Sequence, residues 1–228
     1  MAIAFDAAAQ SGQATNSQTV FSFSHTLGAG ANRVVVVGIA GRQGGTGFNP
    51  TAPTYGGVSM TSVWEEDWNV SNGRAVAIYI IKETLTTGAN TVAWTATSAD
   101  TVSYGLIAAS FTGVDQTAPT SGATGNNGGD TTPTLTITSA TDSMVLTINY
   151  IGSDPATATL TCDGTERIRN VVTSPDTHSR CVCQTKPGAA SVVMAPTQAG
   201  TTTWIEAGMS LKDAPEFGNV SAVFNVTP

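Results

Sequence analysis

The sequence predicts an all-β protein, an antiparallel two-sheet sandwich of jelly-roll-like type, and three observations lead to this class. Apolar and polar residues alternate with a period of two through most of the 228 residues. No window keeps a 3.6-residue period between helix caps. Clusters of Gly, Pro, Asn and Ser separate the alternating runs, as turns do. We therefore expect about ten to twelve strands and no helix. A parallel β-helix is the alternative, but no fixed repeat of about 20–30 residues is present.

The alternation also places individual strands. Residues 19–27 put aromatic and aliphatic side chains, together with His25, on one face, which indicates a half-buried strand. Residues 34–37 are four consecutive Val, and residues 75–81 are apolar on both faces, so we expect central strands there. Further strands are expected at residues 90–97, 102–112, 134–138, 144–151, 168–172, 178–184 and 203–212.

We expect one sandwich domain over residues 1–213, followed by a C-terminal arm over residues 214–228. Residues 117–133 are rich in Gly and Asn, and they are predicted to be a flexible loop. A linker between two half-sandwiches is less favoured, because neither flank alone has enough strands for a core. The arm follows Pro215 and is less polar than a solvated tail, so it is expected to dock on this domain or on a neighbour. Its candidate contacts are Val220, Val223, Phe224 and Val226.

Charge and composition exclude several classes of function. Charged residues make up 11%, against about 25% in most soluble domains, and the net charge is −7. Because Lys and Arg form no run, no nucleic-acid site is expected. No apolar stretch approaches about 18 residues, so no membrane partner or span is expected. The first residues show no basic region followed by an apolar one, which predicts the absence of a cleaved signal peptide.

Three segments occur in an order that matches a known type of module. They are residues 32–38 (Asn-Arg-Val-Val-Val-Val-Gly), 54–58 (Thr-Tyr-Gly-Gly-Val) and 110–119 (Ser-Phe-Thr-Gly-Val-Asp-Gln-Thr-Ala-Pro). Together they resemble a β-sandwich module of tailed-phage virion proteins and of some bacterial surface proteins. The segments correspond to a central strand, a Gly-Gly turn and a strand end. The resemblance therefore brings no catalytic residue with it.

The resemblance implies a non-enzymatic structural protein of a virion, assembled in the cytoplasm of the host bacterium, where no export signal is needed. The expected role is capsid decoration (cement) on the outer surface of a phage capsid. Its partners would be the major capsid protein or other virion proteins, and further copies of this chain. The alternative is a carbohydrate-binding or host-attachment module of a head fibre or tail component.

The densest cluster of functional side chains runs from Trp64 to Trp68, with Glu65, Glu66 and Asp67 between them. Exposed indole rings stack on sugars, and carboxyl pairs serve in glycoside hydrolysis. Adjacent acids on a strand point to opposite faces, which argues against a catalytic pair. An acidic loop pinned to the sandwich by its tryptophans is the favoured interpretation, with sugar binding second.

Trp204 is a further aromatic candidate for a glycan or protein contact. It shares one face of its strand with Glu206 and Lys212, which predicts that its ring is exposed. Together with Trp64 and Trp68 it completes the set of aromatic candidates.

No cofactor or metal site is expected. Cys162, Cys181 and Cys183 lack metal-ligand spacing, and free thiols are favoured over a bridge from Cys162 to either of the others. A bond between Cys181 and Cys183 would be strained. His25 shares its face with two Phe, so a core position is expected rather than a Ser-His-Asp triad. Turn-capping roles are expected for Asp115, Asp130, Asp142, Asp154 and Asp163.

Overall fold

The structure is a computed structural model that describes residues 2–12, 19–42, 50–68, 73–82, 85–96, 103–153, 160–173, 178–199 and 203–215. Within these ranges it contains strands only, so the all-β prediction is confirmed. The same ranges contain no helix of the length and hydrophobicity that a membrane crossing requires. The four candidate contacts of the arm lie outside the described residues: Val220, Val223, Phe224 and Val226.

Nine strands come from each half of the described chain. The first nine are β1 (Ala4–Gln10), β2 (Val20–Leu27), β3 (Val34–Arg42), β4 (Thr54–Tyr55), β5 (Val58–Ser59), β6 (Thr61–Trp68), β7 (Arg74–Lys82), β8 (Gly88–Thr95) and β9 (Ser103–Thr112). The second nine are β10 (Thr120–Gly128), β11 (Leu135–Thr138), β12 (Met144–Ser153), β13 (Leu160–Thr161), β14 (Thr165–Thr173), β15 (His178–Pro187), β16 (Ser191–Met194), β17 (Thr197–Gln198) and β18 (Thr203–Leu211).

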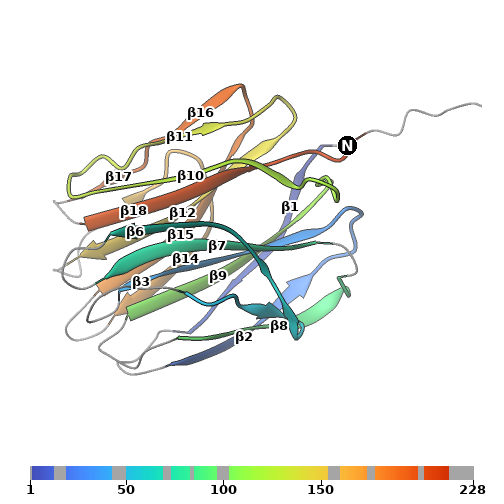
Figure 1. Cartoon of the computed structure of the whole chain (residues 1–228), viewed down its shortest axis with the longest axis horizontal. Coiled ribbons are helices and arrows are strands. Elements are labelled where there is room, and N and C mark those ends of the chain that lie inside the picture. Colours follow the sequence, from blue (N-terminus) through green and yellow to red (C-terminus); the bar gives the residue numbers. More distant parts are fainter. Residues whose placement is uncertain are drawn as a thin grey trace, which may run out of the picture.

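Two five-stranded antiparallel sheets form a central sandwich (Figure 1). The first inner sheet has the order β1-β9-β3-β7-β6, and the second has the order β10-β18-β12-β15-β14. A first outer sheet, β2-β8-β4-β5, covers the far face of the first inner sheet. The strand pairs β11-β16 and β13-β17 cover the far face of the second. The predicted sandwich is confirmed, and its two sheets are each buried on both faces.

The two halves of the chain repeat one strand plan. In each inner sheet the first strand of the half pairs with the last, and the third strand of the half and then two consecutive strands, the later one first, follow in order. The registers match, because Val34 pairs with Phe111 in the first half and Met144 pairs with Leu211 in the second. In the outer layers the pair β2-β8 corresponds to β11-β16. Each position in one half therefore has an equivalent in the other.

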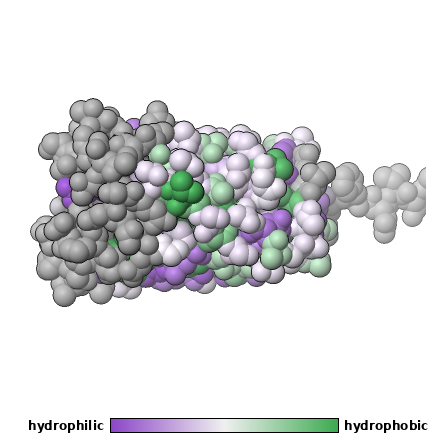
Figure 2. Space-filling view, turned by 90° about the horizontal axis from the view of Figure 1, so that it is seen from below, coloured by the Kyte–Doolittle hydropathy of each residue, from purple (hydrophilic) through white to green (hydrophobic). Residues whose placement is uncertain are grey.

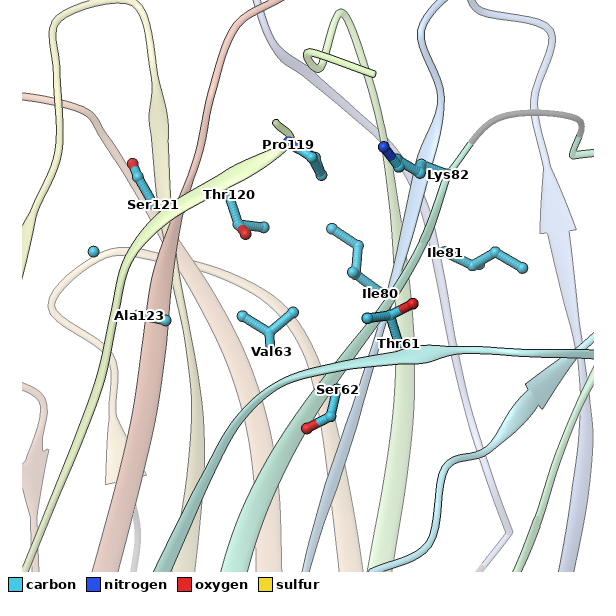
Figure 3. A pocket seen from close by; sticks show the side chains of 11 residues that line it. Thr61, Ser62, Val63, Ile80, Ile81, Lys82, Pro119, Thr120, Ser121 and Ala123 are labelled. Atoms are coloured by element: carbon cyan, nitrogen blue, oxygen red, sulfur yellow. The ribbon is translucent and has the colours of Figure 1, made fainter. Parts of the chain in front are cut away.

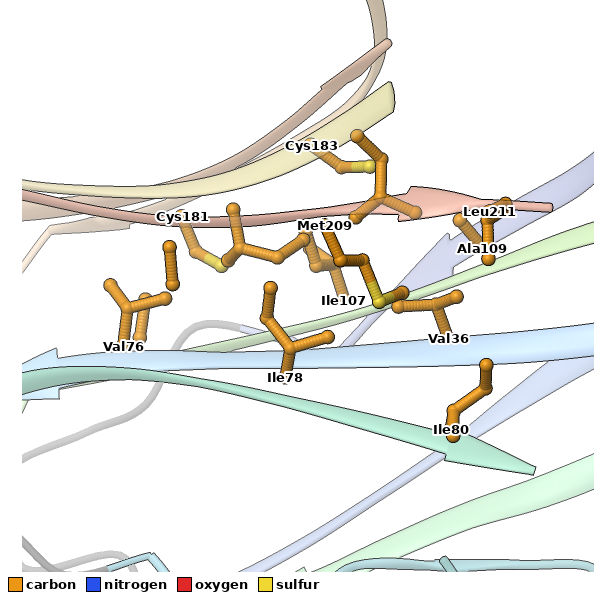
Figure 4. Close-up of a cluster of buried hydrophobic side chains, with 14 of the residues drawn as sticks. Val36, Val76, Ile78, Ile80, Ile107, Ala109, Cys181, Cys183, Met209 and Leu211 are labelled. Atoms are coloured by element: carbon orange, nitrogen blue, oxygen red, sulfur yellow. The ribbon is translucent and has the colours of Figure 1, made fainter. Parts of the chain in front are cut away.

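The run of valines in β3 follows from burial on both faces. Val36 faces the second inner sheet, where it packs in a cluster with Ile78, Cys181 and Met209 (Figure 4). Val35 points the other way, into the core beneath the first outer sheet. A strand with an apolar core on each side has no polar face, so the alternation of half-buried strands is absent there.

The segment predicted to be a flexible loop, residues 117–133, instead contains strand β10, which pairs with β18 along its length. The loop prediction was wrong because Gly and Asn favour turns in sequence statistics. In β10 a glycine is required for close packing instead. Gly122 has a φ of 58°, and a Cβ on it would collide with the backbone oxygen of Thr138. Strand β1 was not predicted either, since its alanines carry no alternation.

Two connections join neighbouring strands closely. Gly56 and Gly57, with φ of 57° and 83°, form the tight turn between β4 and β5, as expected. Strands β14 and β15 pair up to Thr173 and His178, so they form a hairpin. Its turn residues, 174–176, lie outside the described residues.

Candidate functional site

The acidic tryptophan cluster forms edge strand β6 of the first inner sheet rather than a loop. Trp64, Glu66 and Trp68 share the face that looks toward β10, whereas Glu65 and Asp67 share the opposite one. Both indole rings are half-buried and pack against the inner core. The Trp64 Nε1 group donates a hydrogen bond of 3.3 Å to Glu66 Oε2. The Trp64 ring is thus held by its own strand.

Burial changes the acidity of the carboxyls on the other face of β6. Burial, and secondarily the charge of Asp67, raises the pKa of Glu65 to about 7. Burial, and then Glu66, raises the pKa of Asp67. The side chain of Glu65 therefore exchanges a proton near neutral pH. Across the described ranges, no three His, Cys, Asp or Glu side chains gather as a metal site would require.

Strand β10 lies alongside β6, and its glycines allow the close approach. A Cβ on Gly125 would lie 2.6 Å from Trp64 Nε1, so no larger residue fits there without displacing the indole. The Asn127 amide donates to Glu66 Oε1 at 2.9 Å and to the backbone oxygen of Asp67 at 3.4 Å. Side chains therefore link these two edge strands, which belong to different sheets.

The prediction that Trp204 is an exposed aromatic was wrong. Its side chain is only 4% exposed, and its Nε1 donates to Asp130 Oδ1 at 3.0 Å. It packs with Ile151, Leu160 and Val182 beneath the small pair β13-β17. The alternation assigned Trp204 correctly to one face of β18, but this face is covered by an outer layer whose short strands leave little signal in the sequence.

Glu206, on that same face, is fully buried, contrary to the polar surface predicted for it. Neither carboxyl oxygen has a hydrogen-bond partner in the described part of the chain. Burial raises the pKa of Glu206 to about 8, and Thr147 and Asn149 on the neighbouring strand lower it in part. The equivalent positions in the first half hold Leu106, Val37 and Ile39, which are core residues. The second half thus has polar groups where the first has a hydrophobic core.

His25 occupies the core position predicted for it. Its Nδ1 lies 3.0 Å from the Tyr55 hydroxyl oxygen, and its Nε2 lies 3.4 Å from the backbone oxygen of Ala7. Burial lowers the pKa of His25, which favours the neutral ring. A phenol and a peptide oxygen thus stand where a triad would need a serine and a carboxylate. The side chain of His178 lies outside the described residues.

All three cysteines are free, as favoured from the sequence. Cys181 and Cys183 are buried in the inner core, and burial raises the pKa of each thiol. Cys162 lies between β13 and β14 and is half-buried, with its Sγ 3.5 Å from Glu166 Oε2. Burial, and then Glu166, raises the pKa of Cys162 to about 12. The thiol therefore stays protonated near neutral pH, and a protonated thiol is a poor nucleophile.

The turn-capping prediction is confirmed for two aspartates. Asp115 accepts hydrogen bonds from the amides of Thr117 and Ala118, and Asp130 accepts one from Thr132. Asp163 instead accepts hydrogen bonds from Lys186 and the amide of Ala195. Asp142 lies in a turn with a φ of 71°, and Asp154 lies outside the described residues.

A groove of about 610 Å³ opens where β6 and β10 diverge, at the start of both strands (Figure 3). Val63, Ile80 and Ala123 give it an apolar floor, and hydroxyl side chains stand at its rim. The Lys82 ammonium beside it donates to the backbone oxygens of Gln116 and Thr117. The groove is lined by Thr61, Ser62, Val63, Ile80, Ile81, Lys82, Pro119, Thr120, Ser121, Gly122 and Ala123.

Comparison with protein-family models, curated proteins and solved structures finds no match to this chain. The assignment of function therefore rests on the residues and their arrangement.

Sequence reasoning missed both the groove and the buried carboxyl. The groove forms between edge strands of two sheets, neither of which was predicted as a strand, so no local pattern marks it. For Glu206 a signal was available: its segment, residues 203–212, has small or apolar residues at most other positions, as a strand buried on both faces does.

Proposed function

We propose that this protein is a non-enzymatic structural protein of a phage virion, most specifically a decoration protein on the outer capsid surface. One observation carries the proposal: among the described residues, the outward face of the first outer sheet has no charged side chain. Figure 2 views the molecule from the side of this sheet, and the surface is predominantly pale, neither strongly hydrophilic nor hydrophobic. The face consists of Val20, Ser22, Ser24, Thr26, Thr54, Ser59, Ala89, Thr91, Ala93 and Thr95.

Such a face suits contact with a protein lattice for two physical reasons. Short Ser, Thr and Ala side chains lose little rotamer freedom on contact, in contrast to Lys, Arg or Glu. An uncharged surface also adds no repulsion between neighbouring copies of a chain whose net charge is −7. The inner sheets beneath are buried on both faces, so the contact face rests on a packed support.

The proposal predicts the composition of purified phage particles. Quantitative mass spectrometry is expected to find this protein in particles at a copy number near that of the major capsid protein. A double variant with Ser24→Lys and Thr91→Lys should be depleted from particles, because the two ammonium groups must be desolvated in the contact. Thr136→Lys, at an exposed position of β11, is the matched control and should be incorporated normally.

Two results would count against this function. A handful of copies in each particle would indicate a tail or fibre component, and absence from particles would remove the virion assignment altogether.

Glycan binding through the exposed parts of Trp64 and Trp68, which lie on one face of β6, is the second candidate function. If this is correct, oligosaccharides quench the tryptophan fluorescence saturably, and Trp68→Ala abolishes the quenching. Trp94→Phe is the control, because Trp94 is a core residue with 3% exposure and its replacement should leave the saturation curve in place. A linear response in the wild-type protein would exclude the site.

A further inference from the structure

Two equivalent seams close the central sandwich at its edges. The first seam runs between β6 and β10, and the second runs between β14 and β1. In the repeated strand plan β14 takes the place of β6, and β1 takes the place of β10. The registers agree in detail: both β6 and β14 carry a bulge after the second paired residue, which is Ser62 in one and Glu166 in the other. The seams can therefore be compared position by position.

An aromatic ring and a guanidinium group fill the second seam. The Phe5 ring packs edge-on against Phe111, with ring centroids 5.9 Å apart. The guanidinium carbon of Arg167 lies 4.6 Å from the centroid of Phe5, in cation–π geometry. A hydrogen bond of 2.8 Å from Arg167 Nε to the Thr185 hydroxyl holds it there.

Smaller side chains occupy the same positions in the first seam. Thr120 replaces Phe5, because each pairs with the equivalent residue in the last strand of its half. Val63 occupies the bulge position of Arg167, and Ile80 lies beside it. The groove of about 610 Å³ is at this place, and its volume falls within the roughly 300–1,000 Å³ of ligand sites. The first seam thus lacks an aromatic ring that the second seam has.

We propose that this groove accepts an aromatic side chain from residues 216–228 of a second copy of the chain, with Phe224 in the position that Phe5 holds in the second seam. The proposal deepens the assembly role proposed above, on which it rests, by naming a partner and a site. The sequence of the segment fits a strand, because Val220, Ala222, Phe224 and Val226 alternate with mainly polar residues. A strand added at a sheet edge binds through its backbone, and pockets for alternate side chains give specificity.

The chain leaves the described structure at the mouth of the groove. The amide of Lys212 donates to the backbone oxygen of Pro119, a lining residue, at 2.9 Å. The amide of Ala214 then donates to Gly113 at 2.8 Å, so the chain continues past the start of β10. Residues 216–228 reach about 40 Å when extended at about 3.3 Å per residue, which is enough to reach the groove of a neighbour.

The direction of the chain favours exchange between two copies. The end of β18 and the mouth of the groove lie at the same end of the molecule, so the segment must reverse to enter the groove of its own copy. Two copies with these ends facing each other exchange segments without reversal, and a two-fold axis makes both contacts identical.

The mass of the full-length protein in solution tests the exchange. Light scattering during size-exclusion chromatography is expected to give the mass of two chains for the wild type. Phe224→Asp, which places a carboxylate in the groove, and Thr120→Trp, which fills the groove from the position that corresponds to Phe5, should each weaken the dimer at least tenfold. Phe224→Tyr and Ser191→Trp, the latter at an exposed position of β16, are the matched controls and should remain dimeric.

Mixing identifies the contact. The Phe224→Asp protein keeps an intact groove and the Thr120→Trp protein keeps an intact segment, so an equimolar mixture should form a dimer through one of the two contacts. Thr61→Trp, on the opposite wall beside Ile80, repeats the block without altering β10. A wild-type monomer at all concentrations, or dimers that survive both Phe224→Asp and Thr120→Trp, would overturn the exchange. Neither result bears on copy number in particles, so the two proposals fail independently.

Discussion

Replacing Glu206 with Gln is expected to remove a large part of the pH dependence of stability between pH 5 and pH 9. The Glu206 side chain is fully buried, and its two oxygens have no hydrogen-bond partner in the described part of the protein. Burial raises the pKa of Glu206 from 4.5 to about 8 in the folded state. The folded protein therefore holds a proton on Glu206 at neutral pH that the unfolded chain releases. The contribution of Glu206 to stability is therefore most favourable below the pKa that Glu206 has in the unfolded chain, and it falls as the pH rises toward the pKa that Glu206 has in the folded protein.

The shift sets the size of the effect. At about 1.4 kcal/mol for each pH unit, the wild-type protein should lose up to about 5 kcal/mol of unfolding free energy over this range through Glu206 alone. Glu65, with its pKa raised to about 7 by burial and then by Asp67, adds to the same trend in both proteins. Urea unfolding at several pH values measures the difference between wild type and Glu206→Gln.

The matched control for Glu206→Gln is Asp142→Asn, an amide for a carboxyl at an exposed turn, which should leave the pH profile unchanged. Parallel profiles for wild type and Glu206→Gln would show that the Glu206 carboxyl is ionised in the folded state, which would contradict the burial argument.

Gly38→Val is expected to destabilise the protein by about 3 kcal/mol or more, since it inserts a branched side chain between the inner sheets. Gly38 lies in the middle of β3, and even a Cβ there would lie 2.8 to 2.9 Å from three side-chain atoms of Ile148 in the opposite sheet. Both sheets are buried on their far faces as well, so neither can move away without opening a second core. The unfolding midpoint in urea, read by circular dichroism, measures the loss.

A second substitution separates crowding from backbone effects at Gly38. Truncation of the opposing side chain, Ile148→Ala, should cost about 2–5 kcal/mol alone, but it should restore part of the stability of Gly38→Val. Gly12→Ala is the control, because no atom lies within 4 Å of the added Cβ, and it should change stability by less than about 0.5 kcal/mol. If Gly38→Val unfolds at the wild-type midpoint, the sheets do not meet at this residue.

The alternation of polarity predicted several of the strands that have one solvent-exposed face, such as β2 and β11, but not β16. Strand β2 exposes Ser22 and buries Phe21 as expected, and the valines of β3 marked a strand with two buried faces. Strand β10 gave no such signal, because its glycines are selected by the bulk of Trp64 and by the backbone near Thr138. These contacts join segments that are distant in the sequence, so a local sequence pattern cannot reveal them.

The candidate site was less predictable than the fold. The half-buried Trp64 and Trp68 were expected to pin their segment to the sandwich, and they do. Trp204 and Glu206 were assigned to one strand face correctly but to solvent wrongly, because the covering pairs β13-β17 and β11-β16 are two to four residues long. Periodicity gives the face of a residue, whereas its exposure depends on what a remote part of the chain places over that face.

The strand plan has a consequence for synthesis on the ribosome. Because the first strand of each half pairs with the last, the first inner sheet is complete only when β9 has emerged, and the second only when β18 has. The two strands end at Thr112 and Leu211, so about 100 residues separate the two events, or about 5–20 s at about 5–20 residues per second. During this interval the face that carries Val36 and Ile78 lacks its cover. A nascent chain in this state exposes a wide apolar sheet. This makes the chain a substrate for chaperones, and misassembly with other nascent chains begins at this stage.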